Sequence, residues 1–413
     1  MQTQLPDAAS DSVEDQRAKA ILRTCVHCGF CLATCPTYQI LGNELDSPRG
    51  RIYLMKQLFE GMAVSHKTLT HLDRCLTCRS CETTCPSGVR FGKLLDIGRH
   101  RAEEQVVRPL LERVKRAALN QVLPRPGRFS ALLKVGRLVR PLLPTHLRAK
   151  IPNVLASPLI KTTAANGTLS RKMVVLQGCV QPALAPQINA AAARVLQRLG
   201  IELMAADGAR CCGAVSFHLN YQEQGRDAMR RNIDAWWPHV QAGAEAIVTT
   251  ASGCGVTVKD YGHYLADDPT YSKKAEHIAR LAKDIAEIVF AERNRLLERL
   301  KAAARTEPLN VAWHAPCTLQ HGQQINGVVE TLLTAAGYDV QPPMESHLCC
   351  GSAGAYSLLE PGIAMRLRDR KLGFLLSQEP EVIATANIGC LAHLQSGTPV
   401  PVRHWIELLA EAL

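Results

Sequence analysis

Eight cysteines near the start of the chain form one pattern that occurs twice. Each run has the spacing C-x-x-C-x-x-C-x-x-x-C and is followed directly by a proline, and the second run repeats the first after 50 residues. The first run is Cys25, Cys28, Cys31 and Cys35, and the second is Cys75, Cys78, Cys81 and Cys85. So dense a set of soft ligands requires short loops that close around shared centres, which leaves little freedom for the fold of this region.

This spacing is typical of segments that bind two [4Fe–4S] clusters. Each iron of a cluster holds three sulfides and needs one more soft, anionic ligand, which a thiolate supplies. Three cysteines at a spacing of three residues wrap one cluster, while the fourth reaches the other cluster. The expected ligands are therefore Cys25, Cys28, Cys31 and Cys85 for cluster one, and Cys75, Cys78, Cys81 and Cys35 for cluster two.

Zinc and disulfides explain the pattern less well. A zinc site typically has two close pairs of ligands separated by a dozen or more residues. Disulfides require an oxidising compartment, and the acidic N-terminal segment has neither the basic nor the apolar region of a secretory signal. No apolar run approaches the roughly 18 residues of a spanning helix. We expect a cytoplasmic location.

The cysteine region is expected to be helical between its loops. Ser47 and Pro48 predict a helix start, and Gly61 predicts its end. Further helices are expected over residues 65–74 and from Phe91 through about residue 119. Strand signals are poor here, so we predict an all-helical two-cluster ferredoxin domain over residues 1–100.

Residues 101–170 carry most of the chain's net charge of +11. This segment has thirteen Lys and Arg residues against three acidic residues, interleaved with leucine, valine and proline. We predict a basic, helical and proline-rich connector that contacts anionic lipid or a partner subunit. The alternative is a solvated connector whose leucines pack against its own domains. Nucleic acid is not an expected partner, because no groove-reading motif or aromatic stacking platform accompanies the charge.

The rest of the chain reads as a duplicated α/β structure. Short apolar runs that alternate with amphipathic segments predict buried parallel strands and helices. The first half has expected strands at 173–178 and within 244–255 and a helix at 189–200, and the second half repeats them at 310–317, 381–390 and 327–337. We predict two α/β domains, at 171–300 and 308–413, with a charged helical joint over 291–308. The fold class is thus α + α/β.

Each half contains four more cysteines, including a Cys-Cys-Gly (CCG) sequence. They are Cys179, Cys211, Cys212 and Cys254 in the first half, and Cys317, Cys349, Cys350 and Cys390 in the second. Strand ends collect at one edge of a parallel sheet, so these thiols could converge to bind a further iron–sulfur cluster or act as redox thiols. They could instead be packing thiols, the remnant of a lost metal site, or part of a shared binding surface. Nearby histidines are candidate ligands or proton donors, or else structural and surface residues: His218, His314, His321, His347 and His393.

Longer strings add a family resemblance. CVHCGFC, ELDSPRGRIYLMKQ, CCGAVSFHLN, NIDAWWP and SHLCCGSAG stand beside the twin motif and the two CCG sequences. This combination resembles the iron–sulfur subunits of heterodisulfide reductases and of respiratory flavin dehydrogenases, including anaerobic glycerol-3-phosphate dehydrogenase. Within this group the chain is most similar to glycolate oxidase iron–sulfur subunits, over nearly all of its length except 121–170.

The resemblance implies a non-catalytic, electron-transfer subunit of a glycolate oxidase complex. Flavoprotein partners that hold FAD would convert glycolate to glyoxylate, and this chain would relay the electrons toward a membrane quinone-type acceptor. Such a chain would be peripheral on the cytoplasmic face of the inner membrane. The absence of dinucleotide, P-loop and hydrolase motifs agrees with a relay that does not touch the substrate.

Other functions remain open from the sequence. The chain could be a heterodisulfide reductase-like catalyst, the iron–sulfur subunit of a lactate or glycerol-3-phosphate dehydrogenase, or a non-enzymatic sensor or scaffold. Ala251 and Asn387 replace the first cysteine of the C-x-x-C that ends each CCG unit of the heterodisulfide reductase catalytic subunit, which disfavours that chemistry. Near the clusters, Arg49, Arg51, Arg74 and Arg79 are expected to raise reduction potentials or meet an acidic partner; alternatively they balance the clusters' negative charge.

Overall fold

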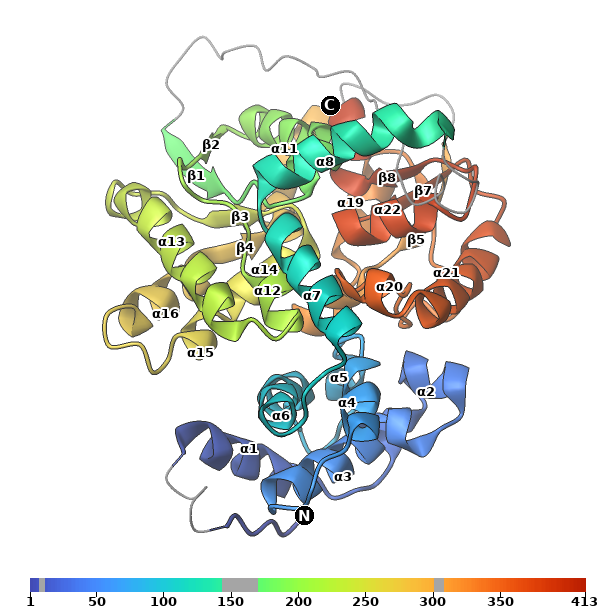
Figure 1. Ribbon diagram of the computed structural model, residues 1–413. Coiled ribbons are helices and arrows are strands. Elements are labelled where there is room, and N and C mark those ends of the chain that lie inside the picture. The colour runs from blue at the N-terminus through green and yellow to red at the C-terminus, as the bar shows by residue number, and fades with distance from the viewer. Residues whose placement is uncertain (7–11, 143–169, 301–307) are drawn as a thin grey trace. The chain divides into compact units, whose positions relative to one another are not determined.

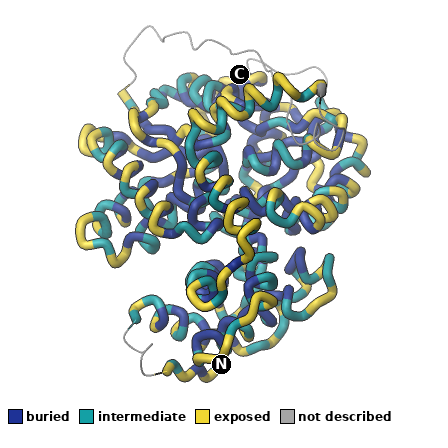
Figure 2. Tube along the Cα trace, viewed as in Figure 1, coloured by how far each residue is buried: buried dark blue, intermediate teal, exposed yellow. Residues whose placement is uncertain are grey.

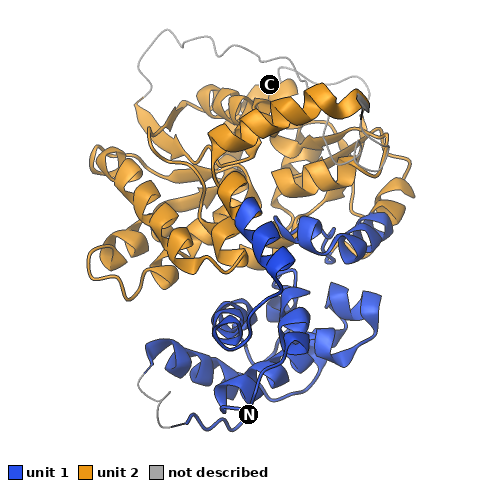
Figure 3. Ribbon diagram, in the orientation of Figure 1, with its two compact units in different colours: residues 1–118, 347–371 blue, residues 119–346, 372–413 orange. Residues whose placement is uncertain are grey.

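The computed structural model describes residues 1–6, 12–142, 170–300 and 308–413. These residues form two compact units (Figure 3): unit 1 comprises 1–118 and 347–371, and unit 2 comprises 119–346 and 372–413. The fourfold domain division expected from the sequence stays a prediction.

Unit 1 has no strand among its described residues, as predicted for the cysteine region. Its helices are α1 (Val13–Thr24), α2 (Pro36–Leu41), α3 (Pro48–Phe59), α4 (His66–Asp73), α5 (Ser80–Thr83), α6 (Phe91–Gln105) and α20 (Tyr356–Leu359), with short 3₁₀ turns at Phe30–Leu32 and Glu44–Asp46. Leu22, Met55, Leu69 and Leu94 are fully buried in its core. This helical scaffold holds the two cysteine loops.

Helix α3 begins as its sequence predicts. The Ser47 side chain accepts a hydrogen bond from the Gly50 N–H at 2.9 Å, and Pro48 occupies the first turn, where its missing N–H costs nothing. The helix ends at Phe59, and Gly61 follows with a φ of 82°. Because α3 lies between the two cysteine loops in sequence, its start sets the positions of the arginines at 49 and 51.

The long helix expected from Phe91 is wrong in its extent. Helix α6 ends at Gln105, and a separate helix, α7 (Leu110–Val122), follows. Pro109 lies between them, and proline disfavours helical geometry in the preceding residue and supplies no N–H. The chain therefore breaks at this point.

Part of the basic connector serves unit 1 itself. Arg108 binds Asp73 at 2.6 Å and Glu103 at 2.9 Å, and Arg116 binds Asp73 at 2.9 Å. Burial alone would raise the pKa of Asp73, but Arg116 and Arg108 outweigh it, so the pKa is lowered. These two arginines are buried in ion pairs within unit 1, which neither the partner-binding prediction nor the solvated-connector alternative anticipated. Residues 143–169 of the connector lie outside the described residues.

Helix α8 (Pro126–Val139) differs from the other long helices because none of its residues is buried (Figure 2). Leu132, Val135 and Leu138 are 61%, 61% and 81% exposed. Among the described residues, no helix is both long and apolar enough to cross a membrane.

Unit 2 contains two four-stranded sheets whose strands are all parallel (Figure 1). The first sheet has the order β2-β1-β3-β4 and the second has the corresponding order β6-β5-β7-β8. The strands are β1 (Arg171–Val175), β2 (Ile201–Ala205), β3 (Ile247–Thr249), β4 (Ala282–Asp284), β5 (Asn310–His314), β6 (Asp339–Gln341), β7 (Val382–Thr385) and β8 (Val402–His404). The shared order confirms the α/β fold and the duplication predicted for this part of the chain.

Helices connect successive strands, as parallel pairing requires. In the first half they are α10 (Gln181–Leu184), α11 (Gln187–Arg198), α12 (Ala214–His218), α13 (Gln222–Gln241), α14 (Ser252–Lys259), α15 (Tyr261–Tyr264), α16 (Ser272–Leu281), α17 (Ile285–Ala291) and α18 (Arg293–Leu300). In the second they are a π-type turn at Thr318–Gly322, α19 (Val328–Ala335), α21 (Pro361–Leu376) and α22 (Ile388–Gln395), and α23 (Trp405–Glu411) follows the last strand. Helix α18 begins the predicted charged joint, of which residues 301–307 lie outside the described residues.

Candidate metal centres

One cavity of unit 1, here called cavity one, is bordered by the four cysteines expected for cluster one. Cys25, Cys28, Cys31 and Cys85 line it, together with Cys81 and apolar residues such as Phe91. Cys85 belongs to the second cysteine run and still lies here. Its thiol is close enough to Cys25 to raise the pKa of that residue, although burial is the larger cause.

A second cavity, cavity two, is lined by the four cysteines expected for cluster two. Cys75, Cys78 and Cys81 border it, and Cys35 of the first run joins them. The fourth cysteine of each run therefore lies at the cavity of the other run. The two ligand sets stay predictions, and this exchange of Cys35 and Cys85 supports both.

Both cysteine loops bend through the same unusual backbone conformation. In the first loop His27 and Gly29 have φ of 58° and 87°, and at the equivalent positions of the second loop Thr77 and Arg79 have φ of 51° and 61°. Positive φ is uncommon outside glycine, so the repetition at matching positions indicates a required turn. The turn also directs the Thr77 N–H to the Cys75 sulfur at 3.4 Å.

The crowded thiols of unit 1 fit a cationic centre. Burial and the neighbouring Cys25 raise the pKa of Cys31 to about 11, and burial with Cys78 and Cys75 raises that of Cys81 well above its usual value. Several buried thiols cannot all become thiolates unless positive charge is placed among them. Iron of a cluster supplies that charge and deprotonates the coordinating thiols. The residues present therefore fit the predicted clusters.

The first CCG half brings its four cysteines together in unit 2. The thiols of Cys179 and Cys212 both lie within hydrogen-bonding reach of Cys211, and Cys254 lies within reach of Cys212. The two hydrogen bonds lower the pKa of Cys211 well below its usual value, while they raise those of Cys179 and Cys212. A cavity bordered by Cys179 and Cys254 opens beside them. One thiolate held by neighbouring thiols suits a metal ligand or a redox-active cysteine.

Two residues that the sequence reasoning missed hold the backbone of this cysteine pair. Asn232 accepts a hydrogen bond from the Arg210 N–H at 2.9 Å and donates one to the Cys211 carbonyl at 2.8 Å. The Tyr261 hydroxyl donates to the Cys212 carbonyl at 2.9 Å and accepts from Asn232 at 3.0 Å. Asn232 is the asparagine of the NIDAWWP string, so that string was a sequence signal for this role.

We expect Asn232→Leu to lower the free energy of unfolding by about 2–4 kcal/mol. The leucine leaves the buried Cys211 carbonyl without its side-chain partner, at about 1–3 kcal/mol, and the part-buried Arg210 N–H without its partner, at about 1 kcal/mol, while the Tyr261 hydroxyl keeps its hydrogen bond to Cys212. Urea-induced unfolding would measure the loss. Gln241→Leu, at the exposed end of the same helix, is the control and should change stability by less than about 0.5 kcal/mol. Equal midpoints for the two variants would contradict this role.

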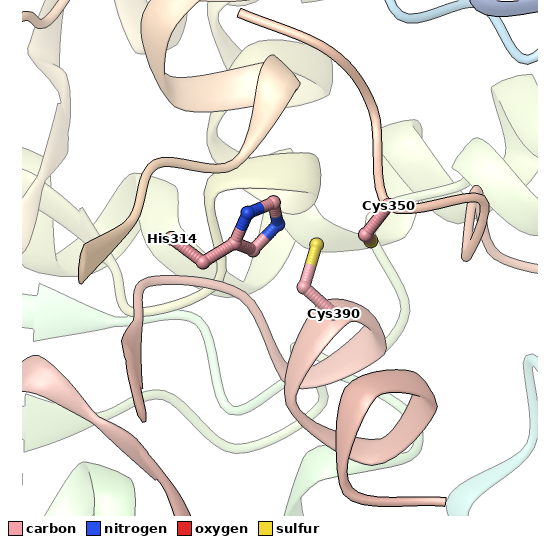
Figure 4. A group of neighbouring side chains, drawn as sticks. All are labelled: His314, Cys350 and Cys390. Carbon is pink, nitrogen blue, oxygen red and sulfur yellow. The ribbon is translucent and has the colours of Figure 1, made fainter. Parts of the chain in front are cut away.

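The second CCG half differs in its ligand chemistry. His314 at the end of β5 is 1% exposed, and one of its ring nitrogens lies within 4.8 Å of the Cys390 sulfur (Figure 4). Cys317 is also buried in unit 2. Cys349 and Cys350 are buried in unit 1, where the Gly351 N–H approaches the Cys349 sulfur at 3.4 Å. The other candidate histidines are only partly buried: His218, His321, His347 and His393.

Ala251 and Asn387 take the same place in the two halves. Ala251 precedes α14, which carries Cys254, and Asn387 precedes α22, which carries Cys390. The side-chain amide of Asn387 donates a hydrogen bond to the Cys390 sulfur at 3.5 Å. An amide donor stabilises a thiolate but cannot replace it as a soft ligand. Each half thus offers four cysteines, as expected.

Comparisons with known proteins agree with this architecture. A family model for the 4Fe-4S dicluster domain matches residues 21–89, and one for the cysteine-rich CCG domain matches residues 173–259 and 311–395. These matches confirm the predicted cofactor class, iron–sulfur clusters, and the two CCG regions.

Several curated proteins are similar to the chain. The glycolate oxidase iron-sulfur subunit of Escherichia coli (strain K12) is 53% identical over 413 residues, which covers 100% of this chain and 99% of that protein. The probable glycolate oxidase iron-sulfur subunit of Bacillus subtilis (strain 168) is 31% identical over 427 residues, covering 95% of this chain and 94% of that protein. Lactate utilization protein A of an Exiguobacterium species is 27% identical over 241 residues, covering 57% and 95%.

Proposed function

Because the chain belongs to the family of glycolate oxidase iron–sulfur subunits, we propose that it relays electrons within a complex that oxidises glycolate to glyoxylate. In this proposal flavoprotein subunits hold FAD and remove two electrons from the substrate, while this chain passes electrons onward one at a time. It contributes no catalytic residue. The acceptor is a quinone-type molecule at the membrane.

The observation that carries the proposal is the pair of cysteine-lined cavities in unit 1. Each cavity is bordered by three cysteines of one run and the fourth cysteine of the other, and Cys81 borders both cavities. Two clusters held in this way lie side by side, which suits transfer of single electrons between them. A substrate site is not needed for this task.

The surface around cavity one suits exchange of electrons with another protein. Cys28 is the one exposed cysteine among the eight of the twin motif. Val26 and Phe30, on either side of it, are 67% and 62% exposed. Exposed apolar side chains beside a cluster ligand favour close docking of a partner, which shortens the path for an electron. We propose that the flavoprotein docks here.

The four thiols around Cys211 support a further redox or metal centre. Their mutual contacts suit a third cluster more than isolated packing thiols, which would not share one low-pKa sulfur. Iron analysis distinguishes the two cases, since two cubane clusters account for about eight irons per chain. A redox dithiol would instead leave the iron count unchanged and yield a Cys179–Cys211 or Cys212–Cys254 disulfide on oxidation.

Helix α8 supports peripheral contact with a membrane. Its exposed leucines and valine are accompanied by Arg128, Lys134 and Arg137, and the helix has no acidic residue. Basic amphipathic helices with apolar exposed faces bind anionic lipid surfaces. Location at the cytoplasmic face of the inner membrane is part of the same proposal.

The test is anaerobic reconstitution. The purified chain should show no oxidation of glycolate by itself, but its clusters should become reduced when glycolate is added together with the flavoprotein subunits. EPR spectroscopy would follow the reduction, and D-lactate in place of glycolate would test the alternative suggested by the similarity to lactate utilization protein A. The proposal fails if the chain alone oxidises glycolate, cleaves disulfide substrates, or contains no iron.

A further inference from the structure

A buried group of charges borders cavity two and has no equivalent at cavity one. Its centre is Arg51, which lines cavity two and whose side chain is 1% exposed. Both terminal nitrogens of Arg51 donate hydrogen bonds to the Thr37 hydroxyl oxygen, at 3.1 and 3.2 Å. That oxygen lies 3.3 Å from the sulfur of Cys35. Because this hydroxyl donates its own proton to the Asp46 carbonyl at 2.9 Å, it places a permanent positive charge near a predicted cluster-two ligand without donating to the sulfur.

One carboxylate holds this arginine and is shared with other groups. Asp46 is fully buried and lies 3.6 Å from Arg51 and 3.2 Å from Arg74. The His71 ring contacts the same carboxylate at 3.0 Å, and the His71 carbonyl accepts a hydrogen bond from Arg51 at 2.7 Å. Two guanidinium groups thus share the single buried carboxylate of Asp46, which neutralises only one of them, while Glu360 faces Arg74 at the more exposed edge of the group. Arg79, half-buried, lines the same cavity.

The cations at cavity one are held differently: the Met1 ammonium donates a hydrogen bond to the Cys25 carbonyl at 2.6 Å. The arginine of this cavity, Arg49, is 34% exposed and is paired with Glu44 at 2.8 Å. This pair is neutral overall and is screened by water.

We propose that Arg51, held by Asp46, is a positioning residue that raises the reduction potential of the cluster in cavity two above that of the cluster in cavity one. Net charge, hydrogen bonds to sulfur and solvent exposure set these potentials. Reduction adds one negative charge to a cluster, and a buried cation stabilises that charge more than a screened, neutralised pair does. With clusters bound in both cavities, one electron would pass from the cluster held at cavity one to the cluster held at cavity two, with no bond made or broken and no proton moved.

This inference rests on the proposed binding of two clusters, and it gives the relay a direction. Electrons enter at the exposed loop around Cys28 and move inward to cavity two. The inference concerns potentials only, so it can be tested on the isolated chain without glycolate or a partner.

The test is a redox titration of the full chain, followed by EPR spectroscopy, with the signals assigned through a Cys28→Ser variant that alters cluster one. Arg51→Gln should shift the reduction equilibrium of cluster two at least tenfold toward the oxidised form, which is 59 mV for one electron. Arg51→Lys keeps the positive charge, so the reduction potential of its cluster two should lie nearer to that of the wild type. Arg49→Gln is the matched control and should shift cluster one less than tenfold.

Removing the negative charge of Asp46 should shift the reduction potential of cluster two in the opposite direction. Asp46→Asn leaves the arginine charges without their partner and should raise the reduction potential of cluster two. This variant tests the inference even if the Arg51→Gln chain does not assemble its clusters. The inference is overturned if Asp46→Asn leaves that potential unchanged or lower, or if Arg51→Gln and Arg51→Lys shift it equally. Wild-type chain that holds no iron would overturn the proposed function, whereas intact clusters with unresponsive potentials would overturn this inference alone.

Discussion

A Cys85→Ala variant is expected to lose or alter the cluster in cavity one and to keep the cluster in cavity two. Cys85 lies in the second cysteine run, yet it borders cavity one with three cysteines of the first run. Removal of one of four thiolate ligands leaves an iron without its soft ligand, so the cluster should be lost or reduced to a three-iron form. Iron analysis and EPR spectroscopy of the anaerobically purified chain would measure the change.

Cys35→Ala is the reciprocal variant and should affect cavity two only. Together the two substitutions separate an exchanged ligand set from one in which each run serves its own cluster. If Cys85→Ala abolished the signal of cluster two and spared that of cluster one, each run would hold its own cluster. Ser87→Ala, at a residue that lines cavity one without a thiol, is the control and should leave both signals in place.

A Gly213→Ala variant is expected to lower the free energy of unfolding by about 2–5 kcal/mol. Gly213, which follows the first cysteine pair, has a φ of 96°, and a Cβ there would lie 2.7 Å from the Gly225 carbonyl oxygen. The left-handed conformation costs an L-residue roughly 1–2 kcal/mol, and forcing a methyl group against backbone costs about 1–3 kcal/mol more. Denaturant unfolding would measure the sum.

Gly243→Ala separates the two costs. Gly243 also has a positive φ, 91°, but a Cβ at this position would meet no other group within 4 Å. Only the conformational cost of about 1–2 kcal/mol should appear there. Gly351, in the second CCG sequence, has a similar close contact: a Cβ there would lie 2.5 Å from the Ala364 carbonyl oxygen. Gly351→Ala should therefore lower the free energy of unfolding about as much as Gly213→Ala. Equal losses at positions 213 and 243 would show that the close contact with Gly225 is unimportant.

Much of the secondary structure followed from local signals. The start of α3 depends on Ser47 and Pro48, which act within a single turn and are visible in any sequence. The parallel strands of unit 2 were predictable because apolar runs alternating with helices have few other ways to be buried. The extent of α6 was missed because Pro109 outweighed a continuous helical pattern.

The sites followed from the sequence only in part. Spacing predicts which cysteines share a cluster, because ligand geometry limits how a short loop can wrap a cube, and the lining of the two cavities supports this prediction. The sequence predicts that Arg51 raises a reduction potential or meets an acidic partner, but the strings ELDSPRGR and NIDAWWP do not indicate the tasks of Asp46 and Asn232. Each task depends on partners distant in sequence: Asp46 meets His71 and Arg74, and Asn232 meets Tyr261.

By itself, then, the order of residues determined the chemistry that this protein carries: two cysteine runs, a duplicated CCG unit and the helices and strands between them. The tertiary structure decided the environment of that chemistry, including a buried cation at one cavity, a neutralised pair at the other and a hydrogen-bonded group of thiols around Cys211. The physical reason is that ligand spacing is a local, covalent property, whereas desolvation and charge pairing arise only when the folded chain brings distant groups together.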